Sequence, residues 1–84
     1  MSSYDTPQAK VIESMLYIQP DGTEVQLLRY RSNQAPFRYP YSVERIVNGK
    51  MVSGSFCLTK EQSCMSFNRW REFEKRLGSK RELK

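Results

Sequence analysis

Side chains capable of catalysis are sparse in this chain. Histidine, the commonest general base and metal ligand, does not occur. Cys57 and Cys64 have no further ligand at zinc spacing, and without a histidine neither thiol has an obvious activating base. The nine carboxylates are scattered along the chain, and there is no glycine-rich phosphate loop. The sequence therefore predicts a protein that is not an enzyme and has no catalytic residue, metal or cofactor.

Basic side chains are more abundant, and their distribution is uneven. The net charge of the 84 residues is +5. Residues 1–24 hold one basic side chain against four acidic ones, residues 25–59 hold five against one, and residues 60–84 hold eight against four. A basic middle and end predict an anionic partner, either nucleic acid or an acidic protein surface. Ordinary solubilising charge is the alternative interpretation.

A small set of basic and aromatic residues could contact such a partner. Arginine and lysine neutralise phosphates, and an aromatic ring beside them can stack on a base. Arg69 and Arg76 are seven positions apart and would line one edge of a helix. The predicted nucleic-acid or partner-binding residues are Arg29, Arg31, Arg38, Tyr39, Lys50, Arg69 and Arg76.

Residues 10–18 and 24–31 are predicted to form a first β-hairpin. Both runs are rich in β-branched and aromatic residues, which fit a pleated sheet. The Pro-Asp-Gly sequence at residues 20–22 is typical of a type I turn with a bulge, because glycine takes the left-handed position. If the two strands pair directly on either side of this turn, Glu13 lies opposite Arg29, which predicts an ion pair across the two strands.

A second hairpin is predicted around Asn48-Gly49, the pair that a two-residue type I′ turn favours. Its predicted strands are 41–47 and 50–58. With Asn48 and Gly49 as the two turn residues, two residues lie opposite each other when their residue numbers add up to 97. Because opposed residues share a face, one side of the hairpin would be apolar and the other would meet water or a partner. The apolar side is predicted to carry Tyr41, Val43, Val52, Phe56 and Leu58, and the other side Ser42, Glu44, Ile46, Met51, Ser53, Ser55 and Cys57.

An amphipathic helix is predicted directly after this hairpin. Thr59 and Gln62 match a capping box, in which the two side chains satisfy free N–H groups at a helix start. Gly78 is suited to the left-handed position that ends a helix. The stripe predicted to pack on the sheet consists of Phe67, Trp70, Phe73 and Leu77, with Ser63 and Ser66 beside it.

Together these elements predict an α+β domain in which an antiparallel sheet of two successive β-hairpins, with three or four strands, packs on one C-terminal α-helix. The domain is expected to span residues 10–78, after a flexible arm at 1–9 and before a basic tail at 79–84. Two cysteines are too few for a secreted disulfide framework, so two thiols are expected. The chain shows no apolar run of membrane-spanning length and no signal-peptide pattern, which predicts a soluble, cytoplasmic protein without membrane contact.

The order of motifs in the second half of the chain is similar to a known DNA-binding arrangement. The residues concerned are Val47-Asn48-Gly49-Lys50, Gly54-Ser55-Phe56, Thr59 and Glu61, with Arg29-Tyr30-Arg31 corresponding to a first strand. This order of strand, turn, strand and helix resembles the AP2 and integrase arm-binding DNA-binding domains over roughly half the chain. The resemblance implies a three-stranded sheet that enters the major groove through the face away from the helix.

The same stretch also resembles a small phage anti-CRISPR protein of the type I-F class. The corresponding positions are Val43, Glu44, Val47, Asn48, Gly49, Lys50, Val52, Glu61, Gln62 and Trp70. This second resemblance implies a protein that occludes a nucleic-acid-binding surface of a host complex without catalysis.

Two functions follow as expectations. The first is a small, non-enzymatic nucleic-acid-binding module, DNA-binding by the first resemblance, of phage or mobile-element origin. The alternative is a protein-binding inhibitor of a host nucleoprotein complex. A neutral sheet face with Ile46 and Met51 would suit such a protein partner.

Overall fold

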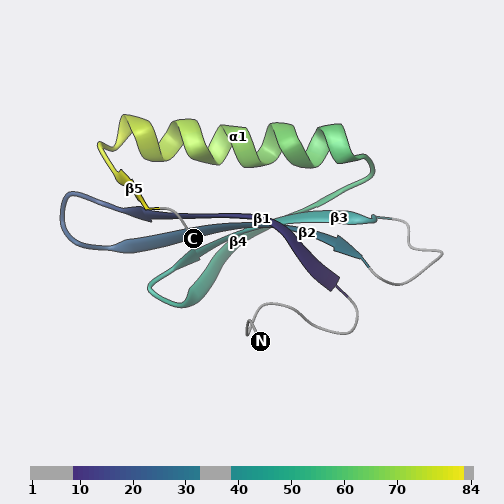
Figure 1. The fold of residues 1–84 in the computed structure, drawn as a ribbon, viewed down its shortest axis with the longest axis horizontal. Helices are drawn as coiled ribbons and strands as arrows, with labels where there is room; N and C mark the ends of the chain where they lie inside the picture. The colour runs from purple at the N-terminus through teal and green to yellow at the C-terminus, as the bar shows by residue number, and fades with distance from the viewer. Residues whose placement is uncertain (1–8, 33–38, 83–84) are drawn as a thin grey trace.

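A computed structural model describes residues 9–32 and 39–82, which form one antiparallel sheet with a helix across one face (Figure 1). The five strands lie in the order β4-β3-β2-β1-β5. The predicted α+β class, with successive hairpins and a C-terminal helix, is confirmed. The elements are β1 (Ala9–Ile18), β2 (Glu24–Ser32), β3 (Tyr41–Val47), β4 (Lys50–Cys57), α1 (Lys60–Arg76) and β5 (Lys80–Glu82).

The fifth strand lies in the segment that the sequence predicts as a tail. After α1 the chain returns to the sheet, and β5 pairs antiparallel with β1, with Arg81 opposite Tyr17. The sheet is also continuous between the two predicted hairpins, because β2 pairs with β3. The helix therefore connects the two edges of the sheet, from β4 to β5.

Both predicted turns are confirmed by their backbone angles. Asn48 and Gly49 have φ of 49° and 85°, as a type I′ turn requires, and Gly22 has φ of 90°. The Asn48 side chain also accepts a hydrogen bond from the backbone N–H of Glu24, which ties the second turn to the start of β2. In the first turn, hydrogen bonds from Thr23 lower the pKa of the Asp21 carboxyl.

The predicted register of the second hairpin is correct only next to the turn. Ile46 lies opposite Met51, but Arg45 lies opposite Ser53, so Val52 is an extra residue in β4. This β-bulge moves every later side chain of β4 to the other face of the sheet. The predicted apolar face is therefore wrong for β4: Phe56 is 73% exposed, and Val52 and Leu58 are also exposed.

The sheet bends away from the helix at two corners. A second bulge leaves Ile12 unpaired between Val11 and Glu13 in β1, and Figure 1 shows the start of β1 and the turn of the β3–β4 hairpin curving away from α1. Bulges bend the strand that carries them. A second apolar cluster forms on this curved face from Leu28, Tyr30 and Ile46, with Ala9 and Val11 packed against it. Ile46 is thus buried and not part of an exposed face.

Both ends of α1 have the capping that the sequence predicts. The backbone N–H of Gln62 donates to Thr59 Oγ1 over 3.1 Å, and Gln62 Oε1 accepts from the N–H of Leu58. At the other end, Gly78 has φ of 80°, and the N–H groups of Gly78 and Ser79 bond to the carbonyls of Lys75 and Glu74. This pattern is a Schellman motif, which fixes where the helix stops.

The face that α1 turns to the sheet is only partly the predicted one. Phe67 is 1% exposed and packs with sheet residues in the main core, and Trp70 packs against the edge of that core. Phe73 and Leu77, however, are exposed. The position that the helix buries in their place is Glu74, with no exposed area. The core residues from the sheet are Tyr17, Val25, Leu27 and Val43.

A buried ion pair explains the orientation of the helix. Glu74 Oε1 accepts from Arg45 Nη2 over 2.8 Å and from Nε over 3.2 Å. Glu74 Oε2 accepts from the Gln19 amide and the Ser79 hydroxyl. The Arg45 guanidinium also lies over the rings of Trp70 and Phe73, at 5.2 and 5.4 Å from their centroids. One carboxylate thus joins α1 to β3, to the first turn and to the segment before β5.

Replacing Glu74 with alanine should destabilise the fold strongly. The change leaves the Arg45 guanidinium without its carboxylate inside the structure, which costs about 3–5 kcal/mol. Chemical denaturation followed by circular dichroism measures the loss. Glu72→Ala is the matched control, because Glu72 is an exposed helix carboxylate paired with Lys75 at 3.7 Å, and it should change stability by less than about 0.5 kcal/mol. Equal losses in the two variants would contradict the assigned role of Glu74.

Candidate binding surfaces

Arg29, a predicted binding residue, is used inside the fold. Its Nε donates to Glu13 Oε1 over 2.9 Å, which confirms the predicted ion pair across the first hairpin. Its Nη1 donates to Ser63 Oγ on α1, and the residue is 8% exposed. Arg29 therefore holds the start of the helix against β2, and little of its charge reaches the surface.

The exposed basic side chains concentrate on the outer side of α1 and on β5. Because Glu74 is neutralised by Arg45, the remaining charges of residues 60–82 are seven basic side chains against three acidic ones. Arg69 and Arg76, two predicted binding residues, are both exposed and lie on this surface. We call it the basic helix surface; its exposed basic residues are Lys60, Arg69, Lys75, Arg76 and Arg81, whereas Arg71 is half-buried and Lys80 lies on the other face of the sheet.

The other predicted binding residues do not join this surface as one cluster. Arg31 is exposed opposite Tyr41 at one end of β3, and Lys50 is exposed opposite Val47 at the other end. A strand of this length separates the two positions by roughly 20 Å. Tyr39 contacts Phe56, with ring centroids 6.2 Å apart. Arg38 lies outside the described residues.

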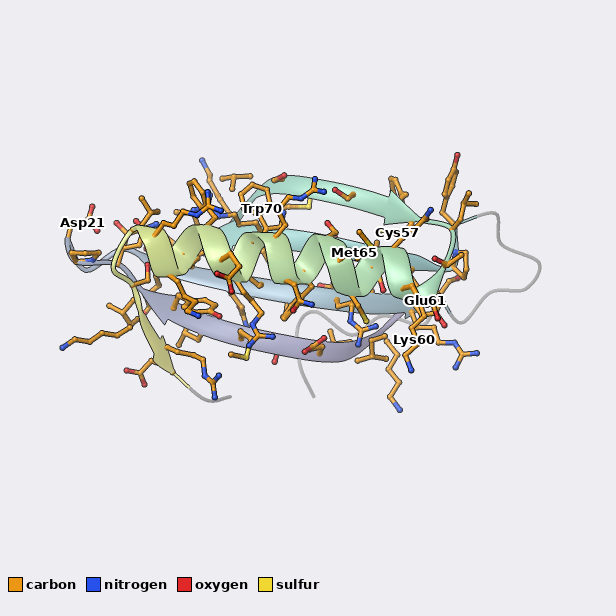
Figure 2. The ribbon with its side chains drawn as sticks, turned by 90° about the horizontal axis from the view of Figure 1, so that it is seen from above. Asp21, Cys57, Lys60, Glu61, Met65 and Trp70 are labelled. Atoms are coloured by element: carbon orange, nitrogen blue, oxygen red, sulfur yellow. The ribbon has the colours of Figure 1, made fainter. Side chains whose placement is uncertain are left out.

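Edge strand β4 and the next residue, Leu58, carry an exposed apolar surface. The sequence predicted Val52, Phe56 and Leu58 on the core side of the hairpin and Met51 on the exposed side, so the prediction is wrong for the first three. Figure 2 shows the helix over the middle of the sheet, with the edge strand beside it left uncovered. Met51, Val52, Phe56 and Leu58 are each more than half exposed. We call these four residues the β4 strip. The one feature of the sequence that could have indicated this exposed strip is the absence of charged residues from 51–58.

A hollow of about 230 Å³ lies within the strip, on the face away from the helix. Gly54 forms its floor, and Met51 and Phe56 stand on either side of it. A methyl group added at Gly54 would meet Met51 Sδ at 3.8 Å and no closer atom. The hollow therefore exists because position 54 has no side chain.

Two thiols lie near the helix side of β4. Cys57 and Cys64 are free cysteines, and burial of Cys57 raises the pKa of its thiol. A second hollow, of about 240 Å³, is lined by Cys57, Met65 and Arg69 among others. Within residues 9–32 and 39–82, no group of three or more His, Cys, Asp or Glu side chains is arranged to hold a metal ion.

Comparisons of the chain with protein-family models, with curated proteins and with solved structures give no match. In the part of the chain that the structure describes, no helix is both long enough and apolar enough to cross a membrane.

The two cysteines should differ in reactivity. Alkylating agents attack the thiolate, and Cys57 is both buried and raised in pKa, whereas Cys64 is partly exposed. We expect iodoacetamide at about pH 8 to modify Cys64 well before Cys57, as measured by peptide mass spectrometry. In denaturant the two rates should become similar. Equal rates in the folded protein would contradict the burial of Cys57.

Proposed function

We propose that the protein is a small, non-enzymatic nucleic-acid-binding module that binds DNA through its basic helix surface. The supporting observation is the way in which the charges divide. Arg29 and Arg45 are paired with Glu13 and Glu74 in the interior. The surplus of positive charge is therefore carried by side chains that point outward from α1 and β5. Such side chains can neutralise phosphates, which supplies most of the affinity of non-specific binding.

The charges on the sheet favour the helix side over the opposite face. The strand registers put Glu24, Glu44 and Glu82 on the face away from α1, and in the described strands Lys80 is the one basic side chain on that face. Three carboxylates against one lysine would repel phosphates there. The proposal therefore differs from the docking mode that the AP2-type resemblance implies, in which this face enters the major groove.

The proposed contacts are to the sugar–phosphate backbone. Phosphate contacts position a protein on the duplex but carry no sequence information directly. Tyr39, the aromatic residue in the predicted set, lies at the β4 edge against Phe56 and not among the exposed arginines of α1. We therefore expect weak dependence on base sequence and a strong dependence on salt.

Replacing Arg69 and Arg76 with glutamine tests the proposal. Both side chains are exposed, so the fold should be kept, while two phosphate contacts are lost. Fluorescence anisotropy with a labelled DNA duplex, between about 50 and 200 mM salt, should show weaker binding. The slope of log K against log salt should become shallower by about two.

The matched control is Ser14→Glu with Gln26→Glu, which lowers the net charge by the same amount on the face away from α1. We expect its affinity to fall much less than that of the arginine variant. An equal fall would mean that only net charge matters and would discard the placement on α1. Absence of binding by the wild type at low salt would discard the proposal itself.

The β4 strip favours a second candidate function, a protein-binding inhibitor of a host nucleoprotein complex. An exposed apolar patch on an unpaired strand edge is a common protein-interaction surface. Either function is consistent with a phage or mobile-element origin and with a cytoplasmic location, where Cys57 and Cys64 would stay reduced.

A further inference from the structure

The two edges of the sheet differ in a way that bears on self-association. Edge strand β5 has three residues, Lys80, Arg81 and Glu82, all charged and exposed. Edge strand β4 has eight residues, of which only Lys50, next to the turn, is charged. Charges and short length are the usual protection of a sheet edge. The β4 edge is interrupted only by the bulge at Val52, so its residues 53–57 are unprotected, and pairing of β4 with the charged β5 of another copy is disfavoured.

The unprotected edge carries a projection and a hollow of matching size. Phe56 is 73% exposed and stands on the face away from α1. The hollow at Gly54 lies on the same face, two residues along the strand, and measures about 230 Å³. An apolar cavity of ~150 Å³ accepts a benzene ring. By size, a phenyl ring from a neighbouring strand would therefore fit over Gly54, between Met51 and Phe56 and beside Glu44, which also lines the hollow.

We propose that β4 pairs antiparallel with β4 of a second copy, about a two-fold axis at Ser55. In this register the residue numbers of opposed positions add up to 110. Phe56 of each copy therefore lies opposite Gly54 of the other. Each copy thus inserts its ring into the hollow of its partner, an isologous arrangement that closes at two copies. The two Phe56 rings would be diagonal neighbours within contact distance.

The size of the contact defines the affinity to expect. Phe56 offers roughly 150 Å² of exposed aromatic surface, and the rest of the β4 strip adds further apolar area. The total per copy is still below the ~800 Å² of a standard interface. Backbone pairing along the free edge supplements it, and we expect a micromolar dissociation constant.

The dimer would also extend the proposed nucleic-acid surface, although its formation does not depend on nucleic-acid binding. A two-fold axis normal to the sheet keeps both α1 helices on one side of a continuous sheet. The two basic helix surfaces would then face the same way. The dimer is nevertheless a property of the protein alone, so its test uses no nucleic acid.

Sedimentation velocity from about 1 to about 200 μM protein measures the association, a range that brackets the expected constant. The wild type should shift from monomer to dimer with concentration. Phe56→Ser removes the projecting ring, and Gly54→Val fills the hollow, where an added Cβ has no close contact; each should weaken association at least tenfold. Ile12→Thr, an exposed residue on β1, should leave it unchanged.

Disulfide crosslinking tests the register without disrupting the contact. In a background of Cys57→Ser and Cys64→Ser, the variant Ser55→Cys puts the two thiols opposite each other, with Cβ atoms about 5 Å apart. Ser53→Cys puts its two copies roughly 13 Å apart along the strands. Oxidation should therefore link Ser55→Cys and not Ser53→Cys.

Three results would overturn the proposal. The first is a wild type that stays monomeric over the whole range, which would leave the β4 strip for a different protein. The second is a dimer that is unaffected by both Phe56→Ser and Gly54→Val. The third is crosslinking of Ser53→Cys in preference to Ser55→Cys.

Discussion

The buried contact between Glu74 and Arg45 is the constraint on which the arrangement of this small domain depends. Glu74 has no exposed area, and its two oxygens accept hydrogen bonds from four groups on three segments. A carboxylate held in this way fixes the rotation of α1 about its axis. With Glu74 turned inward, Arg69 and Arg76 point outward. The charge pairing in the core thus determines which arginines are exposed.

The bulge at Val52 is the second local feature with a long-range consequence. One extra residue in β4 exchanges the two faces of the strand, which exposes Phe56 and buries Cys57. It also bends the hairpin away from α1, so the helix covers the end of β4 at Cys57 and leaves much of the strand uncovered (Figure 2). The molecule consequently has two distinct surfaces: one basic, on the outer side of α1, and one apolar, along the edge of the sheet.

The features that local sequence determines could be predicted. Asn48-Gly49, the Thr59 cap and Gly78 each impose a backbone conformation on their neighbours, and the structure has all three. The pairing of Glu13 with Arg29 followed from the first turn. The bulges could not be predicted, because the alternation of apolar and polar residues does not show which residue is left unpaired. After a bulge, each later side chain of the strand lies on the opposite face from the one predicted.

The burial of Glu74 was missed for a related reason. A helical pattern treats a glutamate as a solvent-facing position, and only the three-dimensional fold brings Arg45 from β3 to the same point. For the candidate site, the sequence predicted Arg69 and Arg76, which are exposed, but also Arg29, which is buried with partners from two other elements. The charge of a residue is visible in the sequence; its pairing is not.

The most direct test of the central claim is a titration of isotope-labelled protein with a DNA duplex, followed by amide chemical shifts. The account predicts that the largest changes cluster on α1 and β5, around Arg69, Arg76 and Arg81. Changes concentrated instead around Glu24 and Glu44, on the face away from α1, would contradict it.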